Sequence, residues 1–232
     1  MYWERAATFH TMGPFGNSIA FHFSAAPCPG RRPAIFLDRD GVINERVVGG
    51  YVTNWSEFRF LSGVLPVLRE LGRLRLPLIV VSNQAGVGKG LMSRAALGRI
   101  TERFVAHLTR AGAPIAAVYY CPHAPDAGCR CRKPRPGLLL RAARDCGIHL
   151  GRSILIGDSP SDVEAARAAG CQSILFDPHA EFLTDRLWQN GRTAARGFAR
   201  VQRVSELPLH AAALLGRCLS DACCGRLTHP PE

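Results

Sequence analysis

Hydrophobic residues in this chain fall into two patterns that alternate along its length. Short continuous apolar runs predict strands that are buried on both faces, whereas apolar residues that recur every three or four positions predict amphipathic helices. The apolar runs predict strands at residues 35–37, 78–81, 115–120, 153–156 and 173–176, and a further strand at 198–204. The chain therefore has the periodicity of a protein in which strands and helices follow one another in turn.

Helical periodicity fills the segments between these strands. Ser62 and Ser93 are predicted to cap two helices, because a serine oxygen can accept a hydrogen bond from the free N–H groups of a first turn. Further helices are predicted at residues 137–146 and 162–169, and a last one from Ser205. Strands that alternate with helices predict crossover connections, so the expected fold class is α/β, a Rossmann-like parallel sheet with helices on both faces.

One predicted domain occupies residues 33–216, and no insertion in it is long enough to form a large cap domain. Residues 1–32 lack helical or strand periodicity, and we expect them to form a disordered or loosely attached extension. They also lack the charged start and the long apolar middle of a secretory leader. Residues 217–232 are expected to form a loose tail.

Composition narrows the class of protein. Of 232 residues, 47% are hydrophobic and 20% are charged, which is ordinary for a globular protein. No apolar run approaches the length of a membrane span. The formal net charge of +11 favours an anionic partner, such as a phosphorylated metabolite, a nucleic acid or an acidic lipid, without choosing among them.

Polar residues follow three of the predicted strands: Asp38 and Asp40, Ser82 and Asn83, and Asp158 and Asp162. The carboxyl ends of parallel strands meet at one edge of a sheet, where α/β folds bind ligands. Asp38 and Asp40 can face one site there, although an ordinary Asp-Gly turn explains that segment equally well. Together with Lys133, the set suits phosphoryl transfer, because carboxylates can attack phosphorus, transfer protons and hold a hard cation.

Cysteines and a histidine cluster in the segment 121–131: Cys121, His123, Cys129 and Cys131. Three thiolates and one imidazole complete a tetrahedral zinc site with no position left for water, so we predict a structural zinc ion in this loop. The alternative is a few buried thiols beside a surface histidine. The clustering of three of the nine cysteines favours metal binding in a reducing, cytoplasmic setting over disulfide bonds.

Four motifs, in order, resemble those of the haloacid dehalogenase (HAD) superfamily: Asp38-Arg39-Asp40-Gly41, Ser82, Lys133 and Gly157-Asp158-Ser159-Pro160-Ser161-Asp162. Longer stretches resemble its branch of D-glycero-D-manno-heptose 1,7-bisphosphate 7-phosphatases and histidinol phosphatases. They are residues 36–44, 81–86, 119–123 and 129–134. The resemblance extends over residues 33–176, and four motifs in register are far more specific than any one of them.

The resemblance implies a role for each motif residue. Asp38 would be the nucleophile that forms an aspartyl-phosphate, and Asp40 would act as the general acid and then the general base. Ser82 and Lys133 would bind the transferring phosphoryl group, and Asp162 would orient these side chains. The Mg2+ ligands that it implies are Asp38, the main-chain carbonyl of Asp40, and Asp158. The positions that contact substrate in the heptose branch are Tyr51, Asn83, Gln84 and Arg132.

The function that the resemblance implies is Mg2+-dependent hydrolysis of the heptose bisphosphate at its 7-phosphate, in the synthesis of ADP-heptose and lipopolysaccharide core precursors. The second phosphate needs a cation, for which Arg132 is the first candidate and Arg46 the second. Alternatives are a histidinol-phosphate phosphatase, a nucleic-acid 3'-phosphatase and a non-catalytic, zinc-stabilised binding module. The expected partner is a small phosphorylated sugar, bound by a monomer without membrane or nucleic-acid binding.

Overall fold

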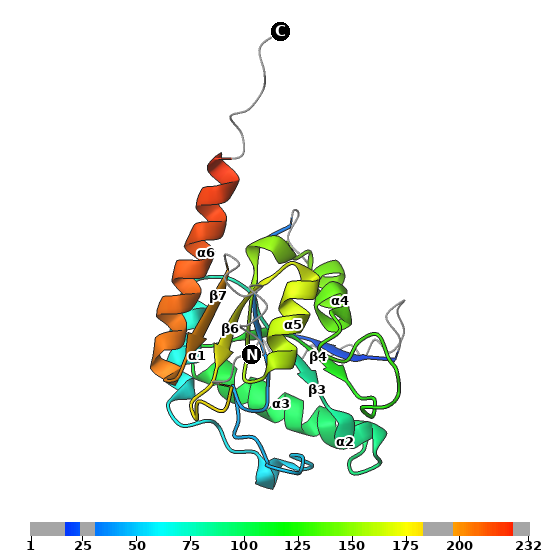
Figure 1. Cartoon of the computed structure of the whole chain (residues 1–232). Helices are drawn as coiled ribbons and strands as arrows, with labels where there is room; N and C mark the ends of the chain where they lie inside the picture. Colours follow the sequence, from blue (N-terminus) through cyan, green and yellow to red (C-terminus); the bar gives the residue numbers. More distant parts are fainter. Residues whose placement is uncertain (1–16, 24–30, 183–196, 225–232) are drawn as a thin grey trace.

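The computed structural model describes residues 17–23, 31–182 and 197–224, with side chains described up to residue 216. Strands in these residues form one seven-stranded sheet in the order β1-β4-β3-β2-β5-β6-β7 (Figure 1). All neighbouring strands are parallel except β1 and β4, which are antiparallel. The strands are β1 (Ile19–His22), β2 (Ile35–Leu37), β3 (Leu78–Asn83), β4 (Ile115–Cys121), β5 (Ile154–Gly157), β6 (Gln172–Phe176) and β7 (Phe198–Val201).

Helices connect the strands, mostly at the predicted places. The α-helices are α1 (Val64–Arg73), α2 (Ala85–Gly88), α3 (Arg94–Arg110), α4 (Gly137–Cys146), α5 (Pro160–Ala169) and α6 (Leu207–Cys224). The short 3-10 helices are η1 (Trp55–Glu57), η2 (Leu150–Arg152) and η3 (Val204–Glu206). The predicted α/β fold class is confirmed, because the parallel strands are joined by helical crossovers.

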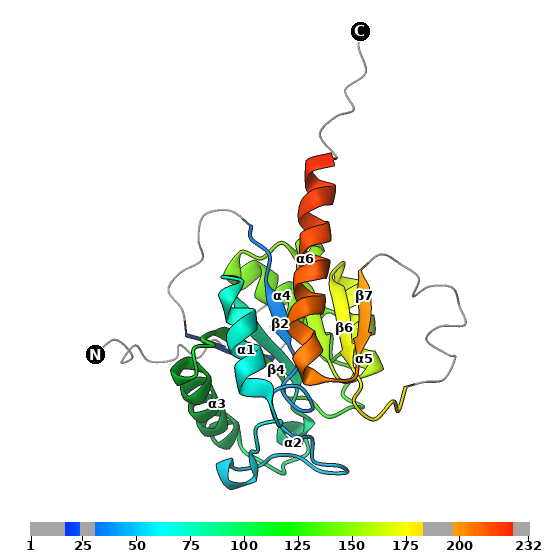
Figure 2. The ribbon, with the colours of Figure 1, turned by 90° about the vertical axis from the view of Figure 1, so that its left-hand side faces the viewer.

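Side chains of the central strands point alternately into two apolar layers. Ile35 and Leu37 of β2 face the layer shared with α1, α3 and α6, whereas Phe36 faces the layer shared with α4 and α5. All three are fully buried. Figure 2 views the sheet from the side of α1 and α6. Helices on both faces explain why these strands are continuous apolar runs rather than alternating ones.

The segment at residues 17–23 is a part of the sheet, so the prediction of a loosely attached extension over 1–32 is wrong there. Strand β1 pairs with β4, and Ile19, Ala20 and Phe21 are buried. The buried guanidinium of Arg141 donates hydrogen bonds to the Ser18 carbonyl and hydroxyl oxygens at 2.5 and 2.7 Å. Four residues are too few to show periodicity, and the contacts that hold this strand come from distant segments. Residues 1–16 and 24–30 lie outside the described residues.

Two further boundaries differ from the predictions. Gly63, with φ of 74°, is the N-cap residue of α1 and makes no side-chain cap, so Ser62 does not cap this helix. Ser93 does cap α3, because its hydroxyl oxygen accepts a hydrogen bond from Ala96 N–H at 3.0 Å. Helix α6 continues to Cys224, so residues 217–224 are helical rather than a loose tail, and 225–232 lie outside the described residues.

Loops, not a second domain, surround the carboxyl ends of the strands. Within the described residues, the connection from β2 to α1 contains only the single turn η1, and the loop from β4 to α4 contains no helix. No insertion of domain size therefore covers this edge of the sheet, as predicted. Among the described helices, none has the length and apolar character to cross a membrane.

Candidate active site and metal centres

Three carboxylates meet where β2 and β5 end. These strands are parallel neighbours with Leu37 opposite Ile156, so Asp38 and Asp158 leave the sheet side by side. Asp162 joins them from the first turn of α5, and oxygens of the three side chains lie within 4.8 Å of one another. The structure thus brings Asp38 next to Asp158 and Asp162, which lie more than a hundred positions later in the sequence.

Two glycines make this close approach possible. A Cβ atom on Gly41 would lie 2.0 Å from Asp158 Oδ2, and one on Gly157 would lie 2.2 Å from Asp162 Cγ. Gly41 also has φ of 86°, a conformation that other residues rarely adopt. Any larger residue at either position would push a carboxylate out of the cluster.

Lys133 supplies the positive charge at the centre of the cluster. Its side chain is 3% exposed, and its Nζ lies 3.0 Å from Asp38 Oδ1 and 2.5 Å from Asp162 Oδ1. Nζ also donates a hydrogen bond to the Val81 carbonyl oxygen at 3.0 Å. Burial lowers the pKa of Lys133, but the Asp162 and Asp38 carboxylates outweigh burial and raise it, so the ammonium is held charged.

One lysine does not neutralise three acids. Burial raises the pKa of Asp38 to about 6, against the opposing effect of Lys133. Burial and the neighbouring Asp38 carboxylate raise the pKa of Asp158 to about 7. A cluster of carboxylate oxygens that resists ionisation is the donor set that a hard divalent cation prefers, so these residues fit Mg2+.

Asp40 lies beside the cluster and accepts hydrogen bonds from three neighbours. Arg39, fully buried, donates from Nη2 to both carboxylate oxygens at 2.8 and 2.9 Å. Asn44 Nδ2 and Gln84 Nε2 donate at 2.8 and 2.7 Å. Burial raises the pKa of Asp40, but the Arg39 guanidinium outweighs burial, and the net pKa is lowered. The sequence analysis missed Arg39 and Asn44, although a charged residue between two aspartates of a buried strand end is a signal for such a pair.

Ser82 and Asn83 end β3 next to this network. Ser82 is 1% exposed, and its hydroxyl accepts a hydrogen bond from Gln84 Nε2 at 3.2 Å. The Asn83 side chain turns towards the loop that carries Lys133, where Nδ2 donates to the Lys133 carbonyl oxygen at 3.1 Å. Its Oδ1 accepts from the Lys133 main-chain N–H, also at 3.1 Å. Both ends of the Asn83 amide are therefore used within the protein.

Arg46 and Arg132 occupy different surroundings near the cluster. Arg46, in the loop after β2, lies 3.6 Å from Asp158 Oδ2 and 3.6 Å from Glu181 Oε2, and its side chain is 46% exposed. Glu181 was not predicted, because no pattern in the sequence links it to a site. Arg132 is half-buried, and its Nη1 is fully buried without a hydrogen-bond partner among the described residues. A buried guanidinium nitrogen with a free N–H fits an absent anionic ligand.

Tyr51, which is predicted to contact substrate, packs against Gly86 of α2. Its ring leaves no room for a larger residue at Gly86, where a Cβ atom would lie 3.2 Å from Tyr51 Cγ. Lys89 Nζ lies 5.4 Å from the centre of this ring, within the range of a cation–π contact. Lys89 adds a cation to this part of the structure.

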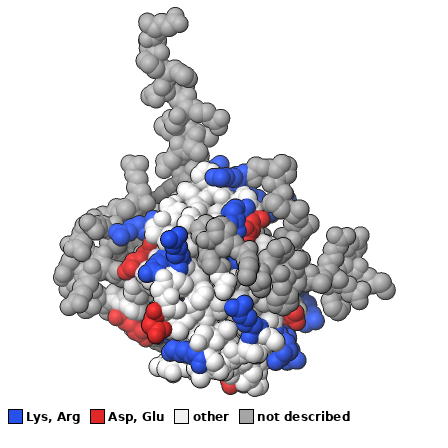
Figure 3. All heavy atoms as spheres, turned by 90° about the vertical axis from the view of Figure 1, so that its right-hand side faces the viewer, with Lys and Arg blue, Asp and Glu red and all other residues white. Residues whose placement is uncertain are grey.

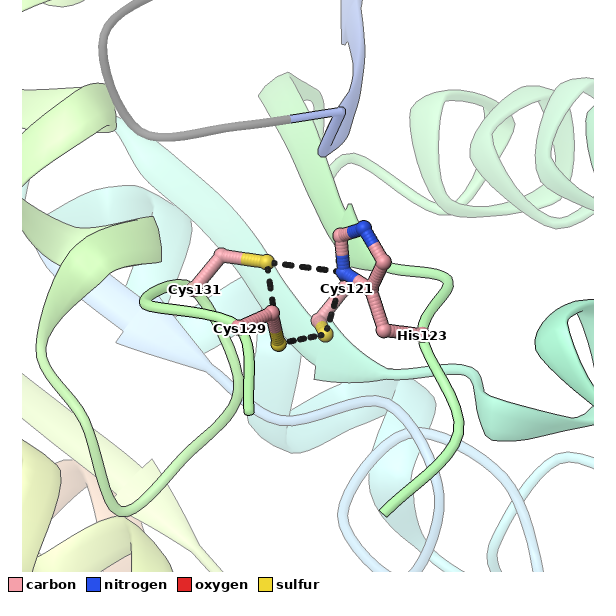
Figure 4. Close-up of side chains that lie close together, drawn as sticks. All are labelled: Cys121, His123, Cys129 and Cys131. Carbon is pink, nitrogen blue, oxygen red and sulfur yellow. Dashed lines mark hydrogen bonds between the residues drawn. The ribbon is translucent and has the colours of Figure 1, made fainter. Parts of the chain in front are cut away.

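The predicted zinc ligands converge on one point (Figure 4). Cys129 Sγ lies 3.5 Å from Cys121 Sγ and 3.7 Å from Cys131 Sγ. His123 Nδ1 lies 3.4 and 3.3 Å from the sulfur atoms of Cys121 and Cys131. Zinc–sulfur bonds of about 2.3 Å give sulfur–sulfur edges of about 3.8 Å in a tetrahedron, so the four atoms fit a zinc ion at their centre.

The protonation of the thiols agrees with this assignment. The hydrogen bond with Cys131 lowers the pKa of Cys121 to about 5, and the interaction with Cys121 raises the pKa of Cys131. Zinc binding needs thiolates, and the lowered pKa favours one already. Both residues, with Cys129, are free cysteines.

The zinc loop packs against the elements that carry the active site. A Cβ atom on Gly88, at the end of α2, would lie 2.5 Å from the main-chain nitrogen of Ala124. The Gln84 main-chain N–H donates to the Cys121 carbonyl oxygen at 2.7 Å. Cys131 precedes Lys133 by two residues. The two clusters are therefore joined through a short stretch of backbone.

Comparison with known proteins places this arrangement in a family. A family model described as HAD-hydrolase-like matches residues 130–178. The D-glycero-alpha-D-manno-heptose-1,7-bisphosphate 7-phosphatase of Mycobacterium tuberculosis is 40% identical over 185 residues, which are 75% of this chain and 96% of that protein. The D-glycero-beta-D-manno-heptose-1,7-bisphosphate 7-phosphatase of Photorhabdus laumondii is 40% identical over 144 residues, or 59% of this chain and 76% of that protein.

The fold agrees with these sequence matches. The structure of D,D-heptose 1,7-bisphosphate phosphatase from B. bronchiseptica, complexed with magnesium and phosphate, superposes with a TM-score of 0.68 at 31% identity. The match covers 80% of this chain and 99% of that one. With its catalytic motifs at one sheet edge and no cap domain in the described residues, the chain belongs to the heptose-1,7-bisphosphate 7-phosphatase family of HAD-like hydrolases.

Proposed function

We propose that the protein is a Mg2+-dependent phosphatase that removes the 7-phosphate of D-glycero-D-manno-heptose 1,7-bisphosphate. The product is a precursor of ADP-heptose and of the lipopolysaccharide core. The observation that carries the proposal is the cluster of Asp38, Asp158 and Lys133 in a chain that is 40% identical to heptose bisphosphatases. Hydrolysis of a phosphate ester is the chemistry that such a cluster supports best.

Asp38 is the proposed nucleophile. Its Oδ1 accepts hydrogen bonds from the Arg39 main-chain N–H at 2.7 Å and lies 3.0 Å from Lys133 Nζ. These two donors fix the plane of the carboxylate and hold it for attack on phosphorus, forming an aspartyl-phosphate. Lys133 and Ser82 then bind oxygens of the transferring phosphoryl group, because both are buried and the Lys133 ammonium contacts the carbonyl oxygen of Val81, the residue before Ser82 in β3.

Asp40 is the proposed general acid and base. It protonates the departing alkoxide oxygen of the sugar in the first step, which releases the sugar hydroxyl, and it accepts a proton from the attacking water in the second. Hydrogen bonds from Arg39, Asn44 and Gln84 hold the carboxylate in one orientation through both steps. The Arg39 guanidinium outweighs burial and lowers the pKa of Asp40, so the acid form requires the negative charge of the bound phosphorylated substrate to raise that pKa.

The residues proposed to hold Mg2+ are Asp38, Asp158 and the main-chain carbonyl of Asp40. When bound, Mg2+ neutralises the negative charge of the phosphoryl oxygens. Asp162 is proposed to position these side chains instead of binding the ion. Its carboxylate is already engaged by Lys133, by Ser159 Oγ at 2.7 Å and by the Ser159 main-chain N–H at 3.2 Å.

Selection of a bisphosphate is assigned to the cations around the cluster. Arg132 Nη1, buried and without a partner among the described residues, is proposed to bind the second phosphate. Arg46 is a second candidate, and Tyr51 and Gln84 are proposed to contact the sugar. On the face drawn in Figure 3, basic side chains are dispersed among uncharged and acidic ones, which does not favour a nucleic-acid groove.

The experiment that tests the function is a phosphate-release assay with purified protein and Mg2+. The substrates are both anomers of the heptose 1,7-bisphosphate, histidinol phosphate and a 3'-phosphorylated oligonucleotide. Release from the heptose bisphosphate, at the 7-position only, is expected to exceed release from the other substrates by at least about a hundredfold in kcat/KM. Preference for histidinol phosphate or the oligonucleotide would contradict the proposal.

The setting of the enzyme is part of the proposal. Zinc ligation needs free thiols, and Cys121, Cys129 and Cys131 are free cysteines, which supports a reducing, cytoplasmic compartment. We propose a monomer, because the residues assigned to catalysis all come from one chain. Sedimentation analysis of the zinc-loaded protein tests the oligomeric state.

A further inference from the structure

Strand β3 contacts Lys133 at two places: the ammonium at the end of its side chain and its main chain. The Val81 carbonyl oxygen accepts a hydrogen bond from the Lys133 ammonium at 3.0 Å. Two residues later, the Asn83 amide pairs with the Lys133 main-chain carbonyl and N–H, each at 3.1 Å. The reciprocal pair resembles the hydrogen bonding between two strands, although one partner is a side chain.

This pair crosses from the sheet to a loop fifty residues away in sequence. Without it, the Lys133 backbone would be attached only through its own neighbours in the chain. Lys133 must also place its buried ammonium 3.0 Å from Asp38 Oδ1. An error of about 1 Å in the position of such a group lowers the rate of a reaction by about a hundredfold.

Most of the hydrogen-bonding capacity of the Asn83 amide is used by Lys133, and one N–H donor remains. Its one carbonyl oxygen and one of its two N–H donors are occupied by Lys133, and the residue is half-buried. By contrast, Arg132 has a buried donor without a partner among the described residues. Near the site, the structure thus distinguishes polar groups that are hydrogen-bonded within the protein from polar groups that have no hydrogen-bond partner among the described residues.

We propose that Asn83 is a positioning residue that fixes the backbone of Lys133, instead of a contact for the sugar. The inference rests on the proposed role of Lys133 in binding the transferring phosphoryl group. Loss of the Asn83 amide then weakens phosphoryl binding and slows transfer for every phosphate ester, whatever alcohol the ester carries. A sugar contact would affect only sugar substrates.

The test compares Asn83→Ala and Asn83→Asp with the wild type on two esters, the heptose bisphosphate and p-nitrophenyl phosphate, which has no sugar. Both variants are expected to lower kcat/KM on the two esters by the same factor, about ten- to hundredfold for Asn83→Ala. Affinity for inorganic phosphate in the presence of Mg2+, measured by calorimetry, is expected to fall by a similar factor. Asn54→Ala, an exposed asparagine in the loop after β2, is the matched control and is expected to change neither.

A double-mutant cycle shows whether Asn83 acts through Lys133. In a Lys133→Met background, adding Asn83→Ala is expected to change phosphate affinity by less than about twofold, because the lysine it positions is absent. Losses that multiply in the double mutant would overturn the inference, as would a loss confined to the heptose substrate. Thermal unfolding and zinc content measured on each variant show that the protein compared is folded.

The outcomes also separate this inference from the proposed function. The wild type could fail to hydrolyse the heptose bisphosphate while Asn83→Ala weakens phosphate binding and p-nitrophenyl phosphate turnover. In that case the proposed substrate is wrong, and the positioning role of Asn83 is supported. If Asn83→Ala leaves phosphate binding and p-nitrophenyl phosphate turnover unchanged, the positioning role is wrong, whatever the natural substrate.

Discussion

The two clusters of metal-binding side chains differ in how the chain assembles them. The ligands of the zinc cluster all come from residues 121–131. In the carboxylate cluster, Asp38 lies more than a hundred positions before Asp158 and Asp162 and meets them only because β2 pairs with β5. The zinc cluster therefore depends on one loop, whereas the catalytic cluster depends on the whole sheet.

Their charges differ as well. Burial raises the pKa of Asp38 to about 6 and that of Asp158 to about 7, so the carboxylate cluster binds protons at higher pH than free carboxyl groups do. In the zinc cluster, the hydrogen bond with Cys131 lowers the pKa of Cys121 to about 5. The comparison shows that burial makes protons harder to remove from the carboxylate cluster, whereas one thiol of the zinc cluster loses its proton more readily than a free thiol.

The largest expected effect comes from removing the nucleophile. Asp38→Asn keeps the shape of the side chain but removes the attacking anion and a proposed Mg2+ ligand. We expect kcat to fall by at least about a thousandfold, with the fold intact by circular dichroism and zinc still bound. Mg2+-dependent turnover above a few per cent of wild type, in protein free of wild-type enzyme, would contradict a covalent mechanism.

The next effect comes from disrupting the zinc cluster. Freshly purified protein is expected to contain one zinc ion per chain by metal analysis. Cys129→Ser is expected to lose zinc and to lower kcat/KM by about tenfold or more, because Arg132 and Lys133 follow the loop directly. The sheet should survive, since zinc contributes less to a folded domain than the about 10–16 kcal/mol that it supplies to isolated zinc-finger peptides.

Cys171→Ser provides the matched control, since Cys171 is not among the four ligands of the zinc cluster. It is expected to keep both zinc and activity. Zinc-free wild-type protein with full activity would show that the two clusters are independent, and would remove the physical link between them described above.

A smaller effect is expected from the arginine assigned to the second phosphate. Arg132→Ala should lower kcat/KM for a sugar bisphosphate by about ten- to hundredfold, which corresponds to a charge-assisted contact of about 1.5–3 kcal/mol. Loss on a monophosphate should be much less. Arg130→Ala, an exposed neighbour, is the control. Equal losses on both substrates would mean that Arg132 does not bind the second phosphate.

The smallest effect concerns pH. Asp38 and Asp158 lose their protons near pH 6 and 7 in the folded, metal-free protein, but near about pH 4 when unfolded. The folded state therefore binds more protons between these values, and its stability falls as pH rises through this window. Mg2+ takes the place of the protons, so it stabilises the protein more at high pH than at low pH.

The measurement is the rise in Tm on adding Mg2+, by calorimetry, at about pH 5 and about pH 8. We expect a rise that is larger by a few degrees at about pH 8. Asp158→Asn, which removes one of the two titrating groups, should reduce the difference between the two pH values. A Tm rise independent of pH would mean that protons and Mg2+ do not compete at this cluster.

The sequence predicted the strand ends and the zinc ligands because each has a local signal. Short apolar runs followed by Asp38 or Asp158 indicate a sheet edge with carboxylates, and the spacing in residues 121–131 indicates a metal site. The short contacts of Lys133 with Asp38 could not be derived from periodicity, because the loop that carries Lys133 has none. Only the resemblance of the motifs placed that lysine in the site.

Contacts between loops that are distant in the sequence cannot be predicted from hydrophobic periodicity or from short motifs. Arg46 and Glu181 lie 3.6 Å apart although 135 positions separate them, and neither belongs to a motif. Strand β1 was missed for the same reason, because its few residues are held by Arg141 and β4. Local propensity is weak in such short segments, and tertiary packing decides their structure.

Strand β1 also determines which edge of the sheet the molecule presents to other proteins. The main-chain N–H and C=O groups of an uncovered strand can pair with a strand of another chain. Here β1 covers β4, whose residues Tyr119 and Tyr120 are fully buried. Protein engineered to begin at residue 31 would leave β4 open, and its first failure would be self-association of otherwise folded molecules. An expression tag is therefore better placed at the carboxyl end, so that β1 keeps its place beside β4.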